Sequence, residues 1–153
     1  MNKTVIQVDT REKKNDHIIS DLEDAHILCL RSKLAFGDYM NIDNPRVVVE
    51  RKSSIRELAT NLCKHHDRFR QELKNAQFYG IHVILLIEDN NGKTSVEDIK
   101  SWINPSAKRN PRAVSGETLY KILVSMQQHY CFDIYFTSKA ACGSRIIQLL
   151  KAV

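Results

Sequence analysis

Three ionisable residues, Asp38, Glu50 and Lys52, lie within one short segment of the chain. Glu50 and Lys52 are two positions apart, and side chains with that spacing on a strand point to the same face. Two carboxylates held close together repel each other, and a hard divalent cation such as Mg²⁺ relieves the repulsion. The metal can activate water, while a nearby ammonium group stabilises the charge that develops on a phosphate under attack. These residue types therefore predict metal-dependent hydrolysis of a phosphodiester bond.

A predicted β-hairpin would bring Asp38 to Glu50. Residues 34–42 and 46–51 are predicted strands, and the turn sequence Asp43-Asn44-Pro45 separates them. A hairpin that turns there pairs positions whose numbers sum to about 88, which places Asp38 opposite Glu50. The D…(E/D)-x-K pattern is loose by itself, so an exposed hairpin with ordinary charges is the alternative.

Several linked motifs make the pattern more specific. The sequence resembles the XPF-type nuclease domain, a member of the restriction-endonuclease-like PD-(D/E)XK superfamily. The matching segments are Val8-Asp9-Thr10-Arg11-Glu12, Gly37-Asp38-Tyr39, Val49-Glu50-Arg51-Lys52-Ser53, Arg68-Phe69 with Glu72-Leu73, and Leu85-Leu86-Ile87-Glu88. Their order and spacing are those of the family across residues 5–88, and the remainder matches only in its pattern of helices and strands. The compact layout is similar to small stand-alone phage and bacterial members.

The resemblance implies a divalent-metal-dependent endonuclease, using Mg²⁺ or Mn²⁺, that cuts branched or flapped DNA. Such an enzyme would process intermediates of DNA replication, recombination or repair. The resemblance implies that Asp38 and Glu50 are metal ligands and that Lys52 is the catalytic cation. It gives Arg51 one of two roles, either supporting the site or contacting a DNA phosphate.

Two other groups of residues are expected near the DNA. The resemblance implies that Asp9, Arg11 and Glu12 line the same site, the two acids as further metal ligands and Arg11 as a DNA contact. The segment of residues 104–116 has two prolines and few apolar residues, so it is expected to be an exposed, mobile loop. Its basic residues, which are either solvated or in contact with DNA phosphates, are Lys108, Arg109 and Arg112.

One position departs from the family pattern. In the best-known members three residues and then an aspartate follow the Glu-Arg-Lys motif, but Arg56 occupies that place here. Glu57 comes one position later, so a shift of one residue at the start of the next helix would give Glu57 the acidic role. Without that shift a metal ligand would be missing.

Other polar residues near the motifs have ordinary explanations beside functional ones. Arg68 can form an ion pair with Glu72 at i,i+4, or it can orient the carboxylates of the site. Glu88 ends a predicted buried strand, and a structural role and a site role are equally open. His65 and His66 are expected to be solvated groups at a helix end rather than ligands.

The remaining pattern alternates strands with helices. The further predicted strands are residues 4–8, 26–30, 82–87 and 132–136, and the predicted helices are residues 15–25, 55–63, 67–79, 94–102, 117–130 and 138–150. Thr94 and Glu97 are predicted to form a capping box, and Ser138 to cap the last helix. The expected fold class is α/β, a restriction-endonuclease-like mixed β-sheet flanked by helices on both faces, with residues 1–153 as a single domain.

Composition sets broad limits on function. The chain has 153 residues with 23 Lys and Arg against 18 Asp and Glu, a mild basic excess that is compatible with DNA but not specific for it. Its four cysteines lack zinc-site spacing and are expected to be reduced thiols. There is no apolar run of membrane-spanning length and no signal-peptide pattern. We therefore expect a cytoplasmic or nucleoid-associated protein that does not bind membranes.

Two other functions remain as alternatives. The first is a catalytically inactive DNA-binding or dimerisation module of the same fold, but such partners lose the motif residues that this chain keeps. The second is a sequence-specific restriction enzyme, which usually needs more chain for base-reading elements than is spare here.

DNA binding is expected to come from the domain itself, from a homodimer or from a partner protein. Larger family members carry a helix-hairpin-helix module or a helicase, and neither is expected within this length. The apolar residues at the end of the chain could form a dimer surface, or they could close the core. They are Ile146, Ile147, Leu149 and Leu150.

Overall fold

The described part of the chain folds around a six-stranded mixed β-sheet. The structure is a computed structural model that describes residues 3–151. The strand order is β2-β1-β3-β4-β5-β6. β1 is parallel to β2, β3 is antiparallel to both β1 and β4, and β4, β5 and β6 are parallel. The strands are β1 (Val5–Val8), β2 (Leu28–Arg31), β3 (Tyr39–Asn41), β4 (Val47–Lys52), β5 (His82–Glu88) and β6 (Asp133–Thr137).

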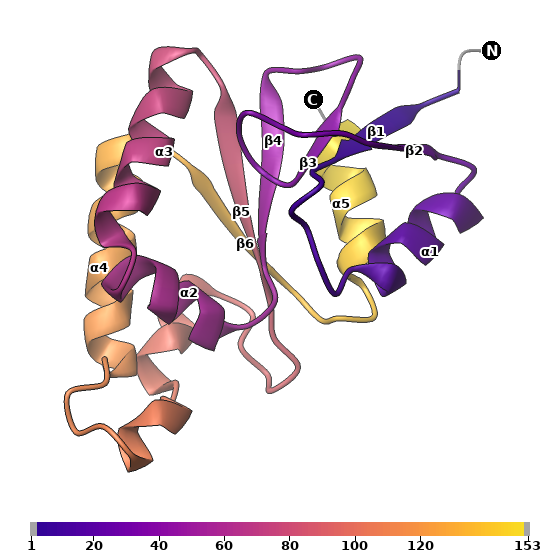
Figure 1. Cartoon of the computed structure of the whole chain (residues 1–153). Coiled ribbons are helices and arrows are strands. Elements are labelled where there is room, and N and C mark those ends of the chain that lie inside the picture. The colour runs from indigo at the N-terminus through magenta and orange to yellow at the C-terminus, as the bar shows by residue number, and fades with distance from the viewer. Residues whose placement is uncertain (1–2, 152–153) are drawn as a thin grey trace.

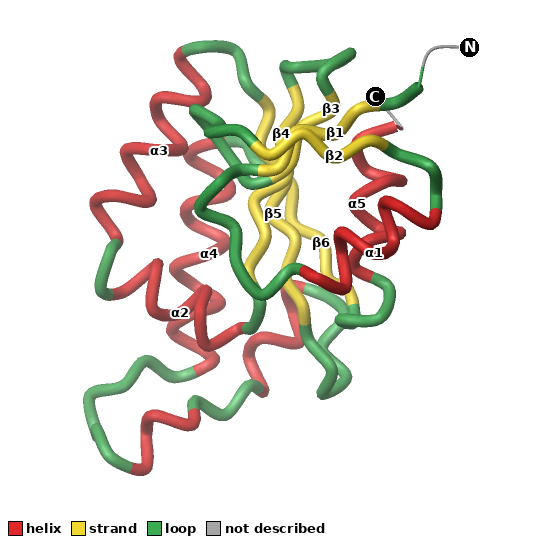
Figure 2. The backbone as a smooth tube through the Cα atoms, turned by 45° about the vertical axis from the view of Figure 1, so that its right-hand side comes forward, coloured by secondary structure: helices red, strands yellow, loops and turns green. Residues whose placement is uncertain are grey.

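Helices cover both faces of this sheet (Figure 1), which confirms the predicted α/β class. One layer consists of α1 (Asp16–Asp24) and α5 (Cys142–Lys151). The other consists of α2 (Ile55–Cys63), α3 (His66–Phe78), α4 (Gly116–Tyr130) and the 3-10 helix η1 (Val96–Ser101). Figure 2 shows the sheet between the two layers.

Each layer has its own apolar core, and β5 contributes to both. Ile84 and Leu86 pack in the core with α1 and α5, whereas Leu85 and Ile87 pack in the core with α2, α3 and α4. Alternate side chains of a strand point to opposite faces, so a strand covered on both sides needs a continuous apolar run. The prediction that this segment is a central buried strand is therefore confirmed.

The segment 94–102 differs from the predicted α-helix. It forms the 3-10 helix η1, and the capping box consists of Ser95 and Asp98, one position after the predicted pair. The carboxylate of Asp98 accepts hydrogen bonds from the main-chain N–H groups of Thr94 and Ser95. Glu97 instead accepts a hydrogen bond from the hydroxyl of Tyr120. The shorter aspartate is at the position that reaches back to the free N–H groups, so the predicted pair was wrong by one residue.

The last helix also begins later than predicted. Ser138 does not cap α5, because its Oγ accepts from the N–H of Ala141 in a turn that precedes the helix. The four apolar residues near the end of α5 belong to the core with α1 or pack against it, which confirms that this face closes the core. Its members are Ile146, Ile147, Leu149 and Leu150.

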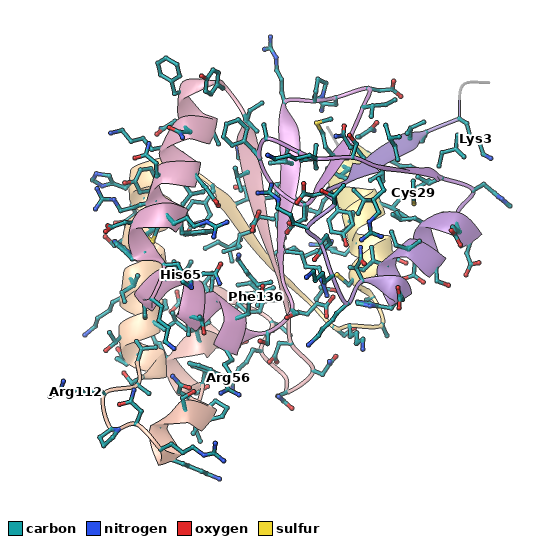
Figure 3. The ribbon with its side chains drawn as sticks, viewed as in Figure 1. Lys3, Cys29, Arg56, His65, Arg112 and Phe136 are labelled. Atoms are coloured by element: carbon teal, nitrogen blue, oxygen red, sulfur yellow. The ribbon has the colours of Figure 1, made fainter. Side chains whose placement is uncertain are left out.

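The loop before α4 contains a short 3-10 helix, η2 (Pro105–Lys108). Asn104 is buried, and its Nδ2 donates to the main-chain oxygen of Val114 at 2.9 Å, which joins the two ends of the loop. Lys108, Arg109 and Arg112 are exposed, as predicted. Figure 3 shows Arg112 on this loop. Of the helices formed by residues 3–151, none has the length and apolar character required to span a membrane.

Candidate active site

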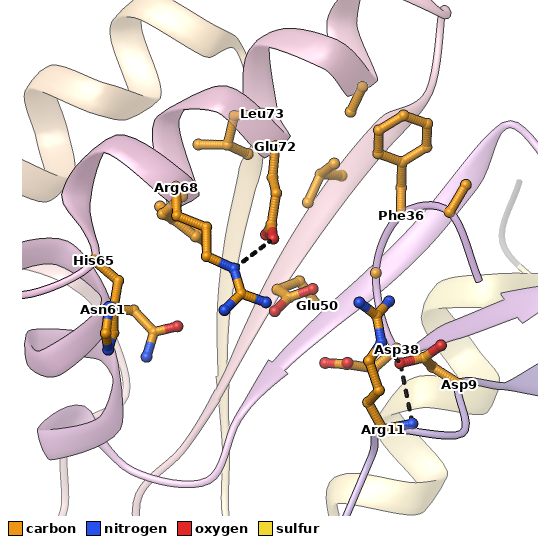
Figure 4. Close-up of a pocket in the computed structure, with 15 residues that line it drawn as sticks. Asp9, Arg11, Phe36, Asp38, Glu50, Asn61, His65, Arg68, Glu72 and Leu73 are labelled. Carbon is orange, nitrogen blue, oxygen red and sulfur yellow. Dashed lines mark hydrogen bonds and ion pairs between the residues drawn. The ribbon is translucent and has the colours of Figure 1, made fainter. Parts of the chain in front are cut away.

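Asp38 and Glu50 line one pocket between the sheet and α3 (Figure 4). The hairpin has the predicted register, because Tyr39 pairs with Val49 and the N–H of Asp38 donates to the oxygen of Val49 at 2.8 Å. Asp38 therefore lies opposite Glu50 at the end of β3. The first strand of the hairpin is shorter than predicted, since only Tyr39–Asn41 is extended as β3.

Gly37 allows the loop to pass close enough to β4 for Asp38 to reach Glu50. Its φ is +71°, in the region that favours glycine, and a Cβ atom there would lie 2.8 Å from Cβ of Val48. Any other residue would have to push the loop away from β4. The glycine of the Gly-Asp motif thus allows the chain to turn tightly enough to deliver the next carboxylate to Glu50.

The two carboxylates repel each other in a poorly solvated place. Burial raises the pKa of Asp38 well above its ordinary value, and the charges of Glu50 and Glu12 raise it further. Burial also raises the pKa of Glu50, and Lys52 opposes that rise only in part. Oδ2 of Asp38 accepts from the N–H of Arg51 and Oε1 of Glu50 accepts from Lys52, whereas Oδ1 of Asp38 and Oε2 of Glu50 have no donor among residues 3–151. Oxygen atoms of this kind are the ligands that Mg²⁺ prefers, so the pair fits a divalent cation.

Lys52 lies on the same face of β4 as Glu50. Its Nζ donates to Oε1 of Glu50 at 3.0 Å and to Oδ1 of Asn61 at 2.9 Å. Burial alone would lower the pKa of Lys52, but the charge of Glu50 outweighs this and raises it. The side chain is therefore an ammonium ion with a fixed position beside the carboxylate pair. Asn61 comes from α2 and was not predicted as part of the site.

Arg51 lies on the opposite face of β4. Its side chain is 3% exposed, and the guanidinium donates to Oε1 of Glu88 at 2.9 Å and to Oε1 of Glu12 at 3.1 Å. It also donates to the main-chain oxygens of Lys13 and Lys14. Because all these partners lie inside the protein, the guanidinium is not placed to contact a DNA phosphate. Of the two roles expected for Arg51, the structure leaves the one of supporting the site. Glu88 takes the structural role as well.

Glu12 is separated from the pocket by this arrangement. One of its oxygens is bound to Arg51, and it does not line the pocket that Asp38 and Glu50 share. Its other oxygen, Oε2, is buried and has no hydrogen-bond partner among the described residues. The structure therefore does not bring Glu12 to the position of a metal ligand beside Asp38.

On the same face of β4 as Arg51, Glu88 also lies close to His17 of α1 and Cys142 of α5. Nε2 of His17 is 2.9 Å from Oε1 of Glu88, and ligand atoms of His17, Glu88 and Cys142 lie within 4.8 Å of one another. Oε1 of Glu88 also accepts from the cationic Arg51, which would repel a metal ion. We interpret the group as part of a buried ion-pair network.

Asp9 and Arg11 do line the pocket, as predicted. Both oxygens of Asp9 already accept hydrogen bonds, Oδ1 from the N–H of Leu34 at 2.8 Å and Oδ2 from Nε of Arg11 at 2.8 Å. Burial raises the pKa of Asp9, but these donors outweigh it and leave the pKa below its ordinary value. Asp9 is thus held as a carboxylate that fixes the loop before Asp38, and Arg11 is half exposed beside it.

Glu57 does not line the pocket, and its carboxylate has another use. Oε2 accepts from the N–H of Ser53 at 2.7 Å and from its hydroxyl, while the N–H of Glu57 donates to Oγ of Ser54 at 3.0 Å. These are the contacts of a reciprocal cap at the start of α2. The predicted one-residue shift therefore does not deliver Glu57 to Asp38 and Glu50.

α3 supplies the other wall of the pocket with residues that the sequence did not assign to it. His65 is exposed at the start of α3, as predicted, and it also lines the pocket. Glu72 lines it too, and Nε of Arg68 lies 3.4 Å from Oε1 of Glu72, as the i,i+4 spacing predicted. The signal that could have found Asn61, His65 and Glu72 is their helical spacing on α2 and α3, but only packing shows which way that face points. Lys108, Arg109 and Arg112 are not among the residues lining this pocket.

Comparison with known proteins gives both sequence and structural matches. The family described as the ERCC4 domain matches residues 8–150. Similar solved structures include XPF from Aeropyrum pernix, with 20% identity, a TM-score of 0.68 and coverage of 97% of this chain and 64% of that chain. XPF from Aeropyrum pernix in complex with DNA has 19% identity and a TM-score of 0.68, with 98% and 64% covered. No match is found among curated proteins. At these identities the structural likeness shows the fold, and the chain spans about 64% of the length of those chains.

Proposed function

The chain belongs to the ERCC4 domain family, and from this premise we propose that it is a divalent-metal-dependent DNA endonuclease selective for branched, flapped or partly single-stranded DNA. The family acts on structure-specific DNA, and its members are generally metal-dependent endonucleases. The observation that carries the proposal for this chain is that Asp38 and Glu50 line one pocket while Nζ of Lys52 lies 3.0 Å from Oε1 of Glu50. The likeness to a structure described as a complex with DNA supports DNA as the ligand.

The residues would divide the chemistry between them. Asp38 and Glu50 would hold Mg²⁺ or Mn²⁺, which when bound polarises a phosphoryl oxygen and lowers the pKa of water. The main-chain N–H of Arg51 holds one oxygen of Asp38 and leaves the other available. The fixed ammonium of Lys52 would stabilise negative charge on the phosphorus centre, since Glu50 and Asn61 keep it in one position.

Positioning of the DNA backbone would fall to cations at the pocket. Arg11 and Arg68 line the pocket and are more than half exposed, so each can reach a phosphate. Lys108, Arg109 and Arg112 would contact DNA outside the pocket, on the loop before α4. A homodimer or a partner protein would extend the binding surface further.

An inactive DNA-binding module is the second candidate, and one observation favours it. Glu57 caps a helix, so the carboxylate that the family pattern leads one to expect after the Glu-Arg-Lys motif has no equivalent in the pocket. Glu72 lines the same pocket and offers an acidic group from α3 in its place. We favour the enzyme because the pair Asp38 and Glu50 is intact.

The biological setting proposed here is DNA replication, recombination or repair in the cytoplasm or at the nucleoid. We do not assign the chain to a phage or to a bacterial stand-alone protein. The similar structures come from Aeropyrum pernix and give such an assignment no support.

A cleavage assay tests the activity. The purified chain would be incubated with labelled flap, splayed-arm, four-way-junction and duplex DNA in Mg²⁺, Mn²⁺ or EDTA. We expect metal-dependent cutting of the branched substrates that Asp38→Ala and Lys52→Ala each abolish. The matched controls, Asp43→Ala in the turn of the same hairpin and the exposed Lys139→Ala, should cut at the wild-type rate. Wild-type protein that binds branched DNA but cuts none with either metal would overturn the proposal in favour of the binding module.

A further inference from the structure

Three aromatic side chains form a ridge at one end of the candidate pocket. The ring centroids of Phe36 and Tyr79 are 6.0 Å apart, and those of Phe78 and Tyr79 are 5.2 Å apart in an edge-to-face arrangement. Phe36 itself lines the pocket and stands two positions before Asp38 (Figure 4). We call Phe36, Phe78 and Tyr79 the aromatic ridge.

The fold does not account for the exposure of this ridge. Phe78, the last residue of α3, is 82% exposed, and Tyr79, which follows it, is 69% exposed. The face of α3 that packs on the sheet is already complete, because Phe69, Leu73 and Ala76 are buried there. Aromatic rings in water are costly, and a contiguous exposed group of them marks a binding surface more often than a single exposed residue does.

We propose that the aromatic ridge binds unpaired DNA bases by stacking, next to the candidate active site. Every base has a flat aromatic face, so exposed rings bind single strands without reading their sequence. The ridge is continuous with the catalytic pocket through Phe36, so a strand with its phosphate at Asp38 and Glu50 has its neighbouring bases beside the rings. This inference rests on the proposed function and adds to it a site for the unpaired part of the substrate.

The charges around the ridge fit a nucleic-acid strand better than an apolar protein surface. Arg11 and Arg68 lie along the same pocket, where a phosphate backbone would run. The exposed residues beside the ridge on α3 are polar, Lys74, Asn75 and Gln77, so the apolar surface is limited to the rings themselves. A protein partner would need a broader apolar patch to bury a stable interface.

Binding measurements on the full chain test the stacking site separately from cutting. The probes are a fluorescein-labelled single-stranded flap DNA and a duplex with the same number of phosphates, both in Ca²⁺ so that binding is recorded without cleavage. We expect the double variant Phe78→Ala/Tyr79→Ala to bind the flap DNA at least about 10-fold more weakly, a loss in the range for one stacked base. Duplex affinity should stay unchanged, and Tyr79→Phe should keep wild-type flap affinity because the ring is retained.

Ile103→Ala is the matched control. Ile103 is 84% exposed but is not among the residues lining the pocket, so removing it deletes exposed apolar surface elsewhere. All these side chains lie in water, so no variant should lose stability, and thermal unfolding would check this. Equal losses for flap and duplex, no loss for either, or a wild type without flap binding would each overturn the stacking site.

Photo-crosslinking gives a second, direct readout. A flap that carries 5-iodouracil near the branch point should crosslink to Phe78 or Tyr79, as mapped by mass spectrometry, and the double variant should lose the crosslink. If Phe78→Ala/Tyr79→Ala instead abolishes self-association in sedimentation and leaves flap binding intact, the ridge is a contact between copies of this chain. A wild type that shows ridge-dependent flap binding but never cuts DNA would support the stacking site while the nuclease proposal fails.

Discussion

The main-chain N–H of Arg51 donates to Oδ2 of Asp38 at 2.8 Å, while its side chain lies on the face of β4 opposite to that of Glu50 and Lys52. One residue therefore orients a pocket carboxylate through its backbone and ties β4 to other elements through its guanidinium. The partners are Glu12, from the segment after β1, and Glu88, at the end of β5. This is a physical reason for an arginine between the two site residues Glu50 and Lys52.

Removing Arg51 should strongly destabilise the protein. Arg51→Ala would leave the carboxylates of Glu12 and Glu88 buried without their main cation, and breaking a buried pair in this way costs about 3–5 kcal/mol. Urea denaturation would give the change in the free energy of unfolding. The control is Arg68→Ala, which breaks an exposed i,i+4 pair and should cost no more than about 0.5 kcal/mol. A stable Arg51→Ala protein would contradict a structural role for this network.

Neutralising Asp38 should stabilise the metal-free protein and abolish cutting. The pKa of Asp38 is raised by burial and by Glu50, so ionisation of this group opposes folding. A raised carboxyl pKa favours the folded state at low pH, and that benefit is lost as pH rises through the folded-state pKa. Asp38→Asn keeps an oxygen that can accept from the N–H of Arg51, and because asparagine does not ionise, the variant does not lose stability as the pH rises. We expect a gain on the order of 1 kcal/mol near pH 8 that shrinks towards pH 4.

Thermal unfolding in EDTA at several pH values would measure that gain. The effect of Mg²⁺ provides a second comparison, because a bound cation should raise the Tm of the wild type but not that of Asp38→Asn. Equal stability of the two proteins at every pH would contradict the raised pKa of Asp38.

The cleavage rate should fall as the pH is lowered, and the fall should begin at a pH above about 4, the ordinary pKa range of carboxyl groups. Metal binding needs Asp38 and Glu50 as carboxylates, and burial and mutual repulsion raise the pKa of each. Protons and metal compete for the same oxygens, so higher Mg²⁺ should move the acid limb to lower pH. Single-turnover rates against pH at two Mg²⁺ concentrations would test this. An acid limb that does not move with Mg²⁺ would assign it to another group.

Glu57→Gln should retain cutting, because Glu57 caps α2 and does not line the pocket. The amide oxygen of glutamine can still accept from Ser53, so stability should hardly change. Glu57→Ala removes the cap and should cost about 1 kcal/mol while leaving the rate per folded molecule near that of the wild type. Initial rates and urea midpoints would separate the two effects. A loss of about 100-fold in Glu57→Gln at unchanged stability would instead make Glu57 part of the catalytic machinery.

Local pattern was sufficient for the parts of the fold that depend on periodicity. The apolar run of β5 predicted a strand covered on both faces, and the turn at Asp43-Asn44-Pro45 predicted the register that places Asp38 opposite Glu50. Both follow from the two-residue period of a strand. Element boundaries were less certain, as η1 and the start of α5 show, because short polar side chains at neighbouring positions compete to cap the same N–H groups.

The sequence by itself determined the pair Asp38 and Glu50, with Lys52 on the same face, since strand period and turn position fix which side chains can meet. Only the tertiary structure decided the rest of the surroundings. Packing of α2 and α3 on the sheet brought Asn61 to Lys52 and made Glu72 a wall of the pocket. On the opposite face of β4, the ion pairs with Glu12 and Glu88 buried Arg51. Such contacts join residues distant in sequence, and their geometry depends on how whole elements pack rather than on any local spacing.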